Sequence, residues 1–334
     1  MMSTEERKTI YLCLAHMSEE GFEQKYVKEA FDTNWVVPMG PNVNAFEQNL
    51  ADFANANLDG SKLDRKVVCL SAGTAAVHLA LIACGVKAGD EVCVQSFTFC
   101  ASSHPITYLG AKPVFIDSER ETWNMDPELL EKAIVERKAV TGKYPKAIIP
   151  VALYGMPYDC ERIMAIADKY GIPVIEDAAE GMGSRFNGQV LGTFGRFGVL
   201  SFNGNKMITT SGGGALICRN EEDANNIMWH ATQARDAYPY YQHTEIGYNY
   251  RMSNVCAGIG RGQMTVLDKH IAHHKHVQAL YKELLEEVKG IHLHEQPETM
   301  NPKTGERKFD SNFWLCAATL DEDVKIQGQE SAYK

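Results

Sequence analysis

The chain has 334 residues, of which 45% are hydrophobic and 23% are charged, and its formal net charge is −10. This balance is typical of a globular protein large enough to bury a sizeable core. The acidic charge excludes a general nucleic-acid-binding surface, and no apolar run is long enough to predict a membrane span.

The N-terminal stretch MMSTEERKTIYL lacks the apolar centre of a signal peptide, which predicts a cytoplasmic protein. The nine cysteines include no CxxC pair, so reduced thiols are expected rather than disulfides or a zinc site. In KHIAHHKH, His270, His273 and His274 share a predicted helix face, but no carboxylate or cysteine is placed to complete a ligand set. The sequence therefore predicts no metal site.

Short apolar runs alternate with helical stretches along most of the chain. A first helix is predicted over 43–57. Predicted strands and further apolar runs then cover 66–73, 90–99, 111–117, 146–155, 172–180, 190–202 and 212–220. Predicted helices follow the first four strands over 74–86, 102–110, 126–138 and 160–171. This alternation indicates an α/β fold with a mostly parallel sheet, whose ligands bind at the carboxyl ends of the strands.

Long helices replace the alternation beyond about residue 260, as in 266–290. We therefore expect a large domain over 1–260, including an N-terminal segment, and the start of a smaller C-terminal α/β domain over 261–334. The smaller domain is expected to be incomplete at residue 334.

Three groups of residues at predicted strand ends carry candidate chemistry. Gly73 and Thr74, in LSAGTAAVHL, form either an anion-binding turn at a helix start or an ordinary N-cap turn. In VIEDAAEG, Glu176 and Asp177 face opposite ways, and we expect one of them to lie in the strand-end cleft. That carboxylate binds either a protonated ring nitrogen or a helix N-terminus. The third candidate is Lys206, which lies in the turn after the apolar run FGVLSF.

A lysine, an acid and an anion-binding turn together match what pyridoxal phosphate requires. Ser201 adds a hydroxyl to the phosphate cup, and Phe99 is either a ring-stacking or a core aromatic. A nicotinamide enzyme fits less well, because neither EGMGSRFNG nor GTFGRFG matches the GxGxxG fingerprint.

Six stretches in order resemble the signatures of the DegT/DnrJ/EryC1/StrS sugar aminotransferases. They are SAGTAAVHLAL, SFTFCAS, ALYGMP, VIEDAAEGMGS, SFNGNKMITTSGGGALI and GYNYRMSNVCAGIGRGQM. The resemblance extends from about residue 36 to about residue 323. It implies the pyridoxal-phosphate-dependent transferase fold of type I, the aspartate-aminotransferase-like fold, with pyridoxal phosphate as cofactor.

The resemblance also implies roles for individual residues. Lys206 matches the Schiff-base lysine, and Asp177 the acid on the pyridine nitrogen. Gly73, Thr74 and Ser201 match the phosphate cup, and Phe99 the stacking aromatic. Asn249, in GYNYRMSN, matches an asparagine that reaches the cofactor phosphate of a neighbouring subunit, which implies a homodimer with shared sites.

Other positions are less settled. Glu180 stands beside the cofactor ring where many relatives have glutamine or histidine. Arg251 lies in the same segment as Asn249 and is a candidate for substrate binding. Arg235 is a candidate for binding the substrate diphosphate, or equally a surface charge.

Within the family, the motifs are most similar to the bacillosamine branch. That branch transfers an amino group from L-glutamate to C4 of a UDP-linked 4-keto-6-deoxy-N-acetylhexosamine. Other nucleotide sugars, namely dTDP-3-keto or GDP-4-keto-6-deoxy sugars, remain rivals as substrates. A non-catalytic regulatory protein that binds pyridoxal phosphate is a more distant alternative.

Overall fold

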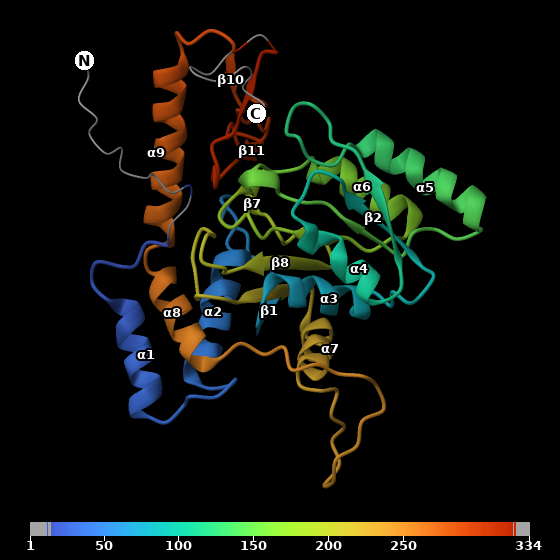
Figure 1. Ribbon diagram of the computed structural model, residues 1–334, viewed down its shortest axis with the longest axis vertical. Helices are drawn as coiled ribbons and strands as arrows, with labels where there is room; N and C mark the ends of the chain where they lie inside the picture. Colours follow the sequence, from blue (N-terminus) through green and yellow to red (C-terminus); the bar gives the residue numbers. More distant parts are fainter. Residues whose placement is uncertain (1–11, 13–14, 323, 325–334) are drawn as a thin grey trace.

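The computed structural model describes residues 12, 15–322 and 324, so the outermost parts of both predicted domains, and Cys13, lie outside the described residues (Figure 1). Within that range, a four-stranded sheet of order β1-β9-β8-β5 lies beside a three-stranded sheet of order β3-β2-β4. Parallel bridges join them, pairing Ile148 with Val174 and Val151 with Asp177. The two sheets thus form one central layer.

The strands of this layer fall within the predicted apolar runs. They are β1 (Lys66–Leu70), β2 (Glu91–Gln95), β3 (Lys112–Ile116), β4 (Ala147–Ile149), β5 (Ile175–Asp177), β8 (Phe197–Ser201) and β9 (Gly214–Cys218). The β2–β3, β2–β4 and β5–β8 pairs are parallel, whereas β9 is antiparallel to both β1 and β8. The predicted α/β fold with a mostly parallel sheet is confirmed. β4 is shorter than its apolar run because Pro150 follows it and the chain then turns at η2 (Leu153–Gly155).

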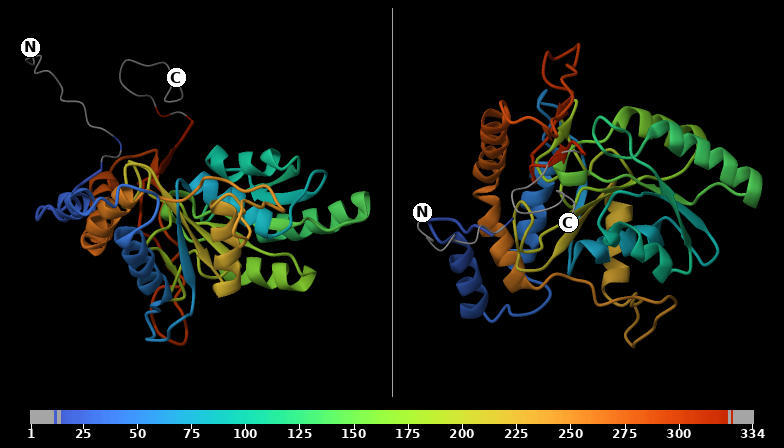
Figure 2. Two further views of the ribbon diagram at one scale, coloured as in Figure 1. Left: turned by 90° about the horizontal axis from the view of Figure 1, so that it is seen from below. Right: turned by 45° about the horizontal axis from the view of Figure 1, so that its top comes forward.

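Helices cover the layer on both sides. They are α1 (Phe22–Asp32), α2 (Pro41–Asn55), α3 (Gly73–Ala83), α4 (His104–Tyr108), α5 (Pro127–Thr141), α6 (Cys160–Tyr170), α7 (Glu221–Ala231), α8 (Asn254–Met264) and α9 (Leu267–Leu285), with the short turn η1 at Cys100–Ser102. In Figure 2 the blue helices α1 and α2 lie beside the orange α8 and α9, and the green α5 and α6 lie at the far side of the sheet. α3 is buried on most sides, which explains why its sequence is apolar all round.

Local sequence signals set the ends of the surface helices. The Asp126 carboxylate accepts the N–H groups of Glu128 and Leu129 at the start of α5, and Pro127 occupies the first turn. Gly142, at φ 75°, ends the same helix in the left-handed conformation. α1, α7 and α8 were not predicted as separate helices.

The C-terminal part pairs with an earlier part of the chain in a small sheet outside the central layer. α9 leads to β10 (Ile291–Leu293), which pairs with β12 (Ala318–Leu320). Between these two, β11 (Phe309–Asp310) pairs with β6 (Arg185–Phe186), which in turn pairs with β7 (Gln189–Val190). These strand pairs do not test the predicted boundary between two domains at residue 260, which stays a prediction.

Glu176 and Asp177 face opposite sides of β5, as their spacing predicts. Glu176 is 1% exposed, and its carboxylate accepts the backbone N–H groups of Gly192 at 2.9 Å, Phe194 at 2.6 Å and Gly195 at 2.7 Å. It therefore organises the turn that leads into β8. Asp177 faces the strand-end pocket described below.

Glu176→Gln is expected to lower the free energy of unfolding by about 1–3 kcal/mol, because the amide NH₂ places a donor against backbone donors and leaves them unsatisfied. Urea denaturation measures the change. Glu136→Gln, an exposed position on α5, is the matched control and is expected to stay within about 0.5 kcal/mol. Equal stability of the two variants would contradict this role for Glu176.

Two further findings concern the described residues alone. None of their helices is both long and apolar enough to cross a bilayer. The eight cysteines among them are free thiols.

Candidate active site

Seven of the predicted site residues line one hollow of about 280 Å³ at the carboxyl ends of the strands. They come from the start of α3, the β2–η1 connection, the end of β5, the end of β8 and the loop before β9. They are Gly73, Thr74, Phe99, Asp177, Glu180, Ser201 and Lys206. The parallel strands bring these distant positions together because their carboxyl ends meet at one edge.

The turn between β1 and α3 is shaped to receive an anion. α3 begins at Gly73 after Ala72, which offers no side-chain cap, so the first N–H groups of the helix have no side-chain partner there. A Cβ at Gly73 would lie 3.1 Å from Cβ of Ser201, and one at Gly214 would lie 2.4 Å from the nitrogen of Gly73. Glycine at these positions keeps the turn close to Ser201, and the helix dipole favours a phosphate there.

Asp177 is the acid that faces the pocket. It is 7% exposed; its Oδ2 accepts the Ser102 hydroxyl at 2.5 Å and its Oδ1 accepts the N–H of Ala179 at 3.2 Å. Ser102 also lies 2.7 Å from the Thr98 hydroxyl. These contacts hold the carboxylate in one orientation, as a partner for a protonated ring nitrogen must be held.

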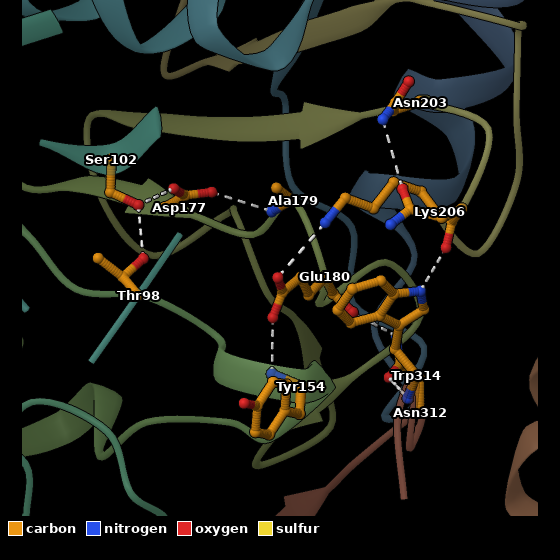
Figure 3. Close-up of polar contacts among 11 residues, drawn as sticks. Thr98, Ser102, Tyr154, Asp177, Ala179, Glu180, Asn203, Lys206, Asn312 and Trp314 are labelled. Carbon is orange, nitrogen blue, oxygen red and sulfur yellow. Dashed lines mark hydrogen bonds and ion pairs between the residues drawn. The ribbon is translucent and has the colours of Figure 1, made fainter. Parts of the chain in front are cut away.

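Lys206 lies between an acid and an indole (Figure 3). Its Nζ is 3.4 Å from Oε1 of Glu180 and 4.1 Å from the centre of the Trp314 ring. The other carboxylate oxygen of Glu180 accepts the N–H of Tyr154 at 2.7 Å. Burial raises the pKa of Glu180, and the Lys206 ammonium opposes that rise.

A segment from the C-terminal part builds the remaining wall. The Trp314 indole donates to the carbonyl of Asn205 at 2.7 Å, and the Asn312 amide donates to the carbonyls of Glu180 and Met182. Sequence reasoning assigned no role to Trp314, Asn312 or Ser102. Ser102 lies within the family signature SFTFCAS, and Trp314 lies in the part of the chain, up to about residue 323, over which the family resemblance extends. This resemblance was the only signal available for them.

Three predicted residues do not line the pocket of their own chain. Asn249 is exposed, in a segment that lies along β1 through the Ser71 N–H to Tyr250 carbonyl bond of 2.8 Å. Arg235 lies 4.4 Å from the centre of the Tyr241 ring, on a protruding loop. The backbone of Arg251 pairs with Leu70. Their roles toward a neighbouring subunit or a substrate stay predictions.

Glu180 is expected to make the stability of the cofactor-free protein depend on pH. Because its pKa in the folded state lies above the ordinary 4.5, the folded chain keeps the proton where the unfolded chain has lost it. This contribution to the free energy of unfolding is fully present below 4.5 and is lost as pH rises through the folded pKa.

Urea denaturation from pH 4 to pH 8 measures this contribution. Wild type is expected to lose stability relative to Glu180→Gln as the pH rises. The exposed control Glu128→Gln is expected to follow wild type at every pH. A difference between wild type and Glu180→Gln that does not change with pH would contradict the raised pKa.

The described residues include no group of three or more His, Cys, Asp or Glu side chains placed to hold a metal ion. The side chains that line the pocket suit an organic cofactor. The anion-binding turn fits a phosphate, Asp177 fits a protonated pyridine nitrogen and Lys206 supplies an amine. Fold and pocket together define a pyridoxal-phosphate-dependent aminotransferase of fold type I.

Comparison with known proteins gives the family. The model of the DegT/DnrJ/EryC1/StrS aminotransferase family matches residues 17–329, and the chain belongs to this family. A solved DegT DnrJ EryC1 StrS aminotransferase from Brucella abortus superposes with a TM-score of 0.79 at 28% identity, covering 90% of this chain and 75% of that one. The chain is a sugar aminotransferase that uses pyridoxal phosphate.

Three curated relatives are named for different activities. EpsN of Bacillus subtilis (strain 168), named as a pyridoxal phosphate-dependent aminotransferase, is 46% identical over 95% of this chain and 76% of its own length. GDP-perosamine synthase of Escherichia coli O157:H7 is 36% identical over 84% and 73%. UDP-2-acetamido-2-deoxy-3-oxo-D-glucuronate aminotransferase of Pseudomonas aeruginosa is 37% identical over 75% and 65%.

Proposed function

We propose that this enzyme transfers the amino group of L-glutamate to C4 of a UDP-linked 4-keto-6-deoxy-N-acetylhexosamine. The observation that carries the proposal is the Glu180 carboxylate 3.4 Å from the Lys206 amine, inside a pocket that also holds Asp177. Glutamate at position 180, where many relatives have glutamine or histidine, agrees with the resemblance of the motifs to the bacillosamine branch. The Pseudomonas relative, named for a UDP-linked acetamido sugar, supports the nucleotide.

When bound, pyridoxal phosphate supplies an electron sink for the carbanion formed at the amino-bearing carbon. Gly73, Thr74 and Ser201 would hold its phosphate, Phe99 would stack on its ring and Asp177 would bind its ring nitrogen. The amine of Lys206 would take a proton from the donor's Cα and deliver it within the pocket. Glu180 would hold the Lys206 ammonium in reach between these transfers.

We further propose a cytoplasmic homodimer with shared sites, in which Asn249 would contact the cofactor phosphate of the neighbouring subunit. Arg235 and Arg251 would contribute positive charge toward the substrate diphosphate. The exposed positions of Asn249 and Arg235 support this proposal, because neither side chain is used within its own pocket.

The second candidate is a GDP-4-keto-6-deoxy sugar, favoured by the similarity to GDP-perosamine synthase. The visible absorption band of the lysine-bound cofactor separates the two. Glutamate is expected to bleach it, and the UDP-linked keto sugar to restore it. Recovery with the GDP-linked sugar alone would replace the proposed substrate with the second candidate.

A further inference from the structure

The turn that carries Lys206 has no regular structure of its own. Between β8 and β9, residues 202–213 form turns and bends rather than helix or strand. Lys206 donates its backbone N–H to the carbonyl of Asn203 at 3.0 Å, within the turn. The Trp314 indole donates to the carbonyl of Asn205, the residue before the lysine. The position of the Lys206 amine therefore depends on partners outside the turn.

A histidine of α9 binds the carbonyl on the other side of the lysine. Nδ1 of His270 lies 3.2 Å from the carbonyl oxygen of Met207, the residue after Lys206. Because a carbonyl oxygen can only accept, Nδ1 is the ring nitrogen that carries the hydrogen. Burial lowers the pKa of His270, so the ring is neutral at pH 7 and this bond fixes its tautomer. Ring N–H groups from the C-terminal part thus hold both carbonyls that flank Lys206.

One helical turn further along α9, His274 binds the segment that carries Trp314. Its ring forms a hydrogen bond with the backbone of Phe313, the residue before the tryptophan. Residues four apart lie on the same face of a helix, so the two histidines present neighbouring rings. α9 therefore fixes the lysine turn and the tryptophan segment relative to each other. This arrangement sets the 4.1 Å between Nζ of Lys206 and the centre of the Trp314 ring (Figure 3).

A small hollow shows how closely the histidines pack against the lysine turn. It measures about 30 Å³, and His270, His274, Met207 and Lys206 are among the residues that line it. Among the described residues, Lys206 alone lines both this hollow and the active-site pocket. The hollow has the volume of about one water molecule, so it suits packing rather than the binding of a ligand.

The same part of α9 also makes contacts that dock the helix without touching the lysine turn. Nζ of Lys275 lies 2.6 Å from Oδ1 of Asp310, and the Gln278 amide donates to the carbonyl of His294 at 2.9 Å. Neither contact involves a chain neighbour of Lys206. A variant at Lys275 therefore loosens α9 while leaving both carbonyls beside the lysine bound, which makes it a control for any effect of docking alone.

We propose that His270 and His274 are positioning residues for Lys206, which keep its amine where it meets the aldehyde carbon of pyridoxal phosphate. In that step the amine adds to the carbon, a C=N bond forms, and the aldehyde oxygen leaves as water with two hydrogens from the amine. A looser turn brings the amine into place less often, so the step is slower. The inference rests on the role of Lys206 in the proposed function, but not on the identity of the sugar.

The rate at which the cofactor-free enzyme captures pyridoxal phosphate, followed by the absorption band of the lysine-bound cofactor, tests the proposal. His270→Phe keeps a ring without its N–H and is expected to slow capture about tenfold or more. His270→Asn keeps an N–H near the position of Nδ1 and is expected to restore the rate to within about threefold of wild type. Lys275→Met is the matched control and is expected to capture like wild type. Thermal unfolding verifies that each variant is folded.

Two further measurements extend the test. His274→Phe is expected to slow capture as well, because the segment of Trp314 is then held less firmly over the amine. In the holoenzyme, His270→Phe is expected to lower the rate of the glutamate half-reaction while the half-saturating glutamate concentration stays unchanged. That split is expected because the histidine acts on the lysine and not on the donor.

Capture by His270→Phe at the rate of Lys275→Met would overturn the proposal. Equal slowing in His270→Phe and His270→Asn would also overturn it, because ring packing rather than the hydrogen bond would then be what matters. The proposed function fails differently, since no sugar takes part in capture. If the capture rates are as expected but no amine reaches a UDP-linked keto sugar, the positioning role stands and the substrate proposal falls.

Discussion

Lys206→Ala is expected to abolish transamination, with a loss of about 10⁴-fold or more in turnover, while the protein stays folded. The size follows from the loss of the group that moves protons in the pocket, a role that alone contributes up to about 10⁴-fold. Among the described residues that line the pocket, Lys206 is the one cation. Its neighbours Glu180 and Trp314 hold the amine in place, and neither carries a group that replaces it.

Single-turnover reaction with glutamate, followed by absorbance, measures the loss. Adding methylamine is expected to restore part of the rate in Lys206→Ala, because a free amine then carries the proton. Lys146→Ala, an exposed position just before β4, is the control and is expected to react like wild type. Turnover of Lys206→Ala within tenfold of wild type would contradict the assignment of this lysine.

The sequence predicts that Glu176 and Asp177 lie on opposite sides of β5, because strand side chains alternate strictly. Alternation alone could not decide which of the two faces the pocket. That choice depends on the turn at 192–195, whose N–H groups bind Glu176 on the other face. The existence and order of the strands, by contrast, were predictable from the alternation of apolar runs and helices.

The walls of the pocket depend on contacts that no local pattern contains. Trp314 reaches Lys206 because buried Ser311 and Asn312 bind the chain near Gly155 and Glu180. The positive φ of Trp123 and Tyr154 could not be predicted from the sequence either, since neither residue type favours that conformation. The buried side-chain amides of Gln95 and Asn124, which are distant in the sequence, hold these segments in place. The family resemblance covers Trp314 without giving a physical reason for this tryptophan.

Asp177→Asn is expected to lower the rate of the glutamate half-reaction by about 10²–10³-fold, the loss typical of removing one preorganised electrostatic partner. Asparagine has nearly the same shape: its oxygen can accept the Ala179 N–H, while its NH₂ can donate to the hydroxyl oxygen of Ser102. What it lacks is the negative charge that would hold a protonated ring nitrogen. The fold is expected to survive, because a buried neutral amide costs less to desolvate than a carboxylate.

The comparison that isolates charge from geometry is Ser102→Ala. It removes one hydrogen bond to Asp177 but leaves the carboxylate charged and bound to the Ala179 N–H, so its rate is expected to fall by about tenfold, the equivalent of about 1.4 kcal/mol and near the low end for one hydrogen bond to a charged group. If Asp177→Asn reacts no more slowly than Ser102→Ala, orientation rather than charge is what Asp177 supplies, and its assignment as the partner of the ring nitrogen is wrong. A large loss in Asp177→Asn with a small loss in Ser102→Ala places the effect on the carboxylate itself.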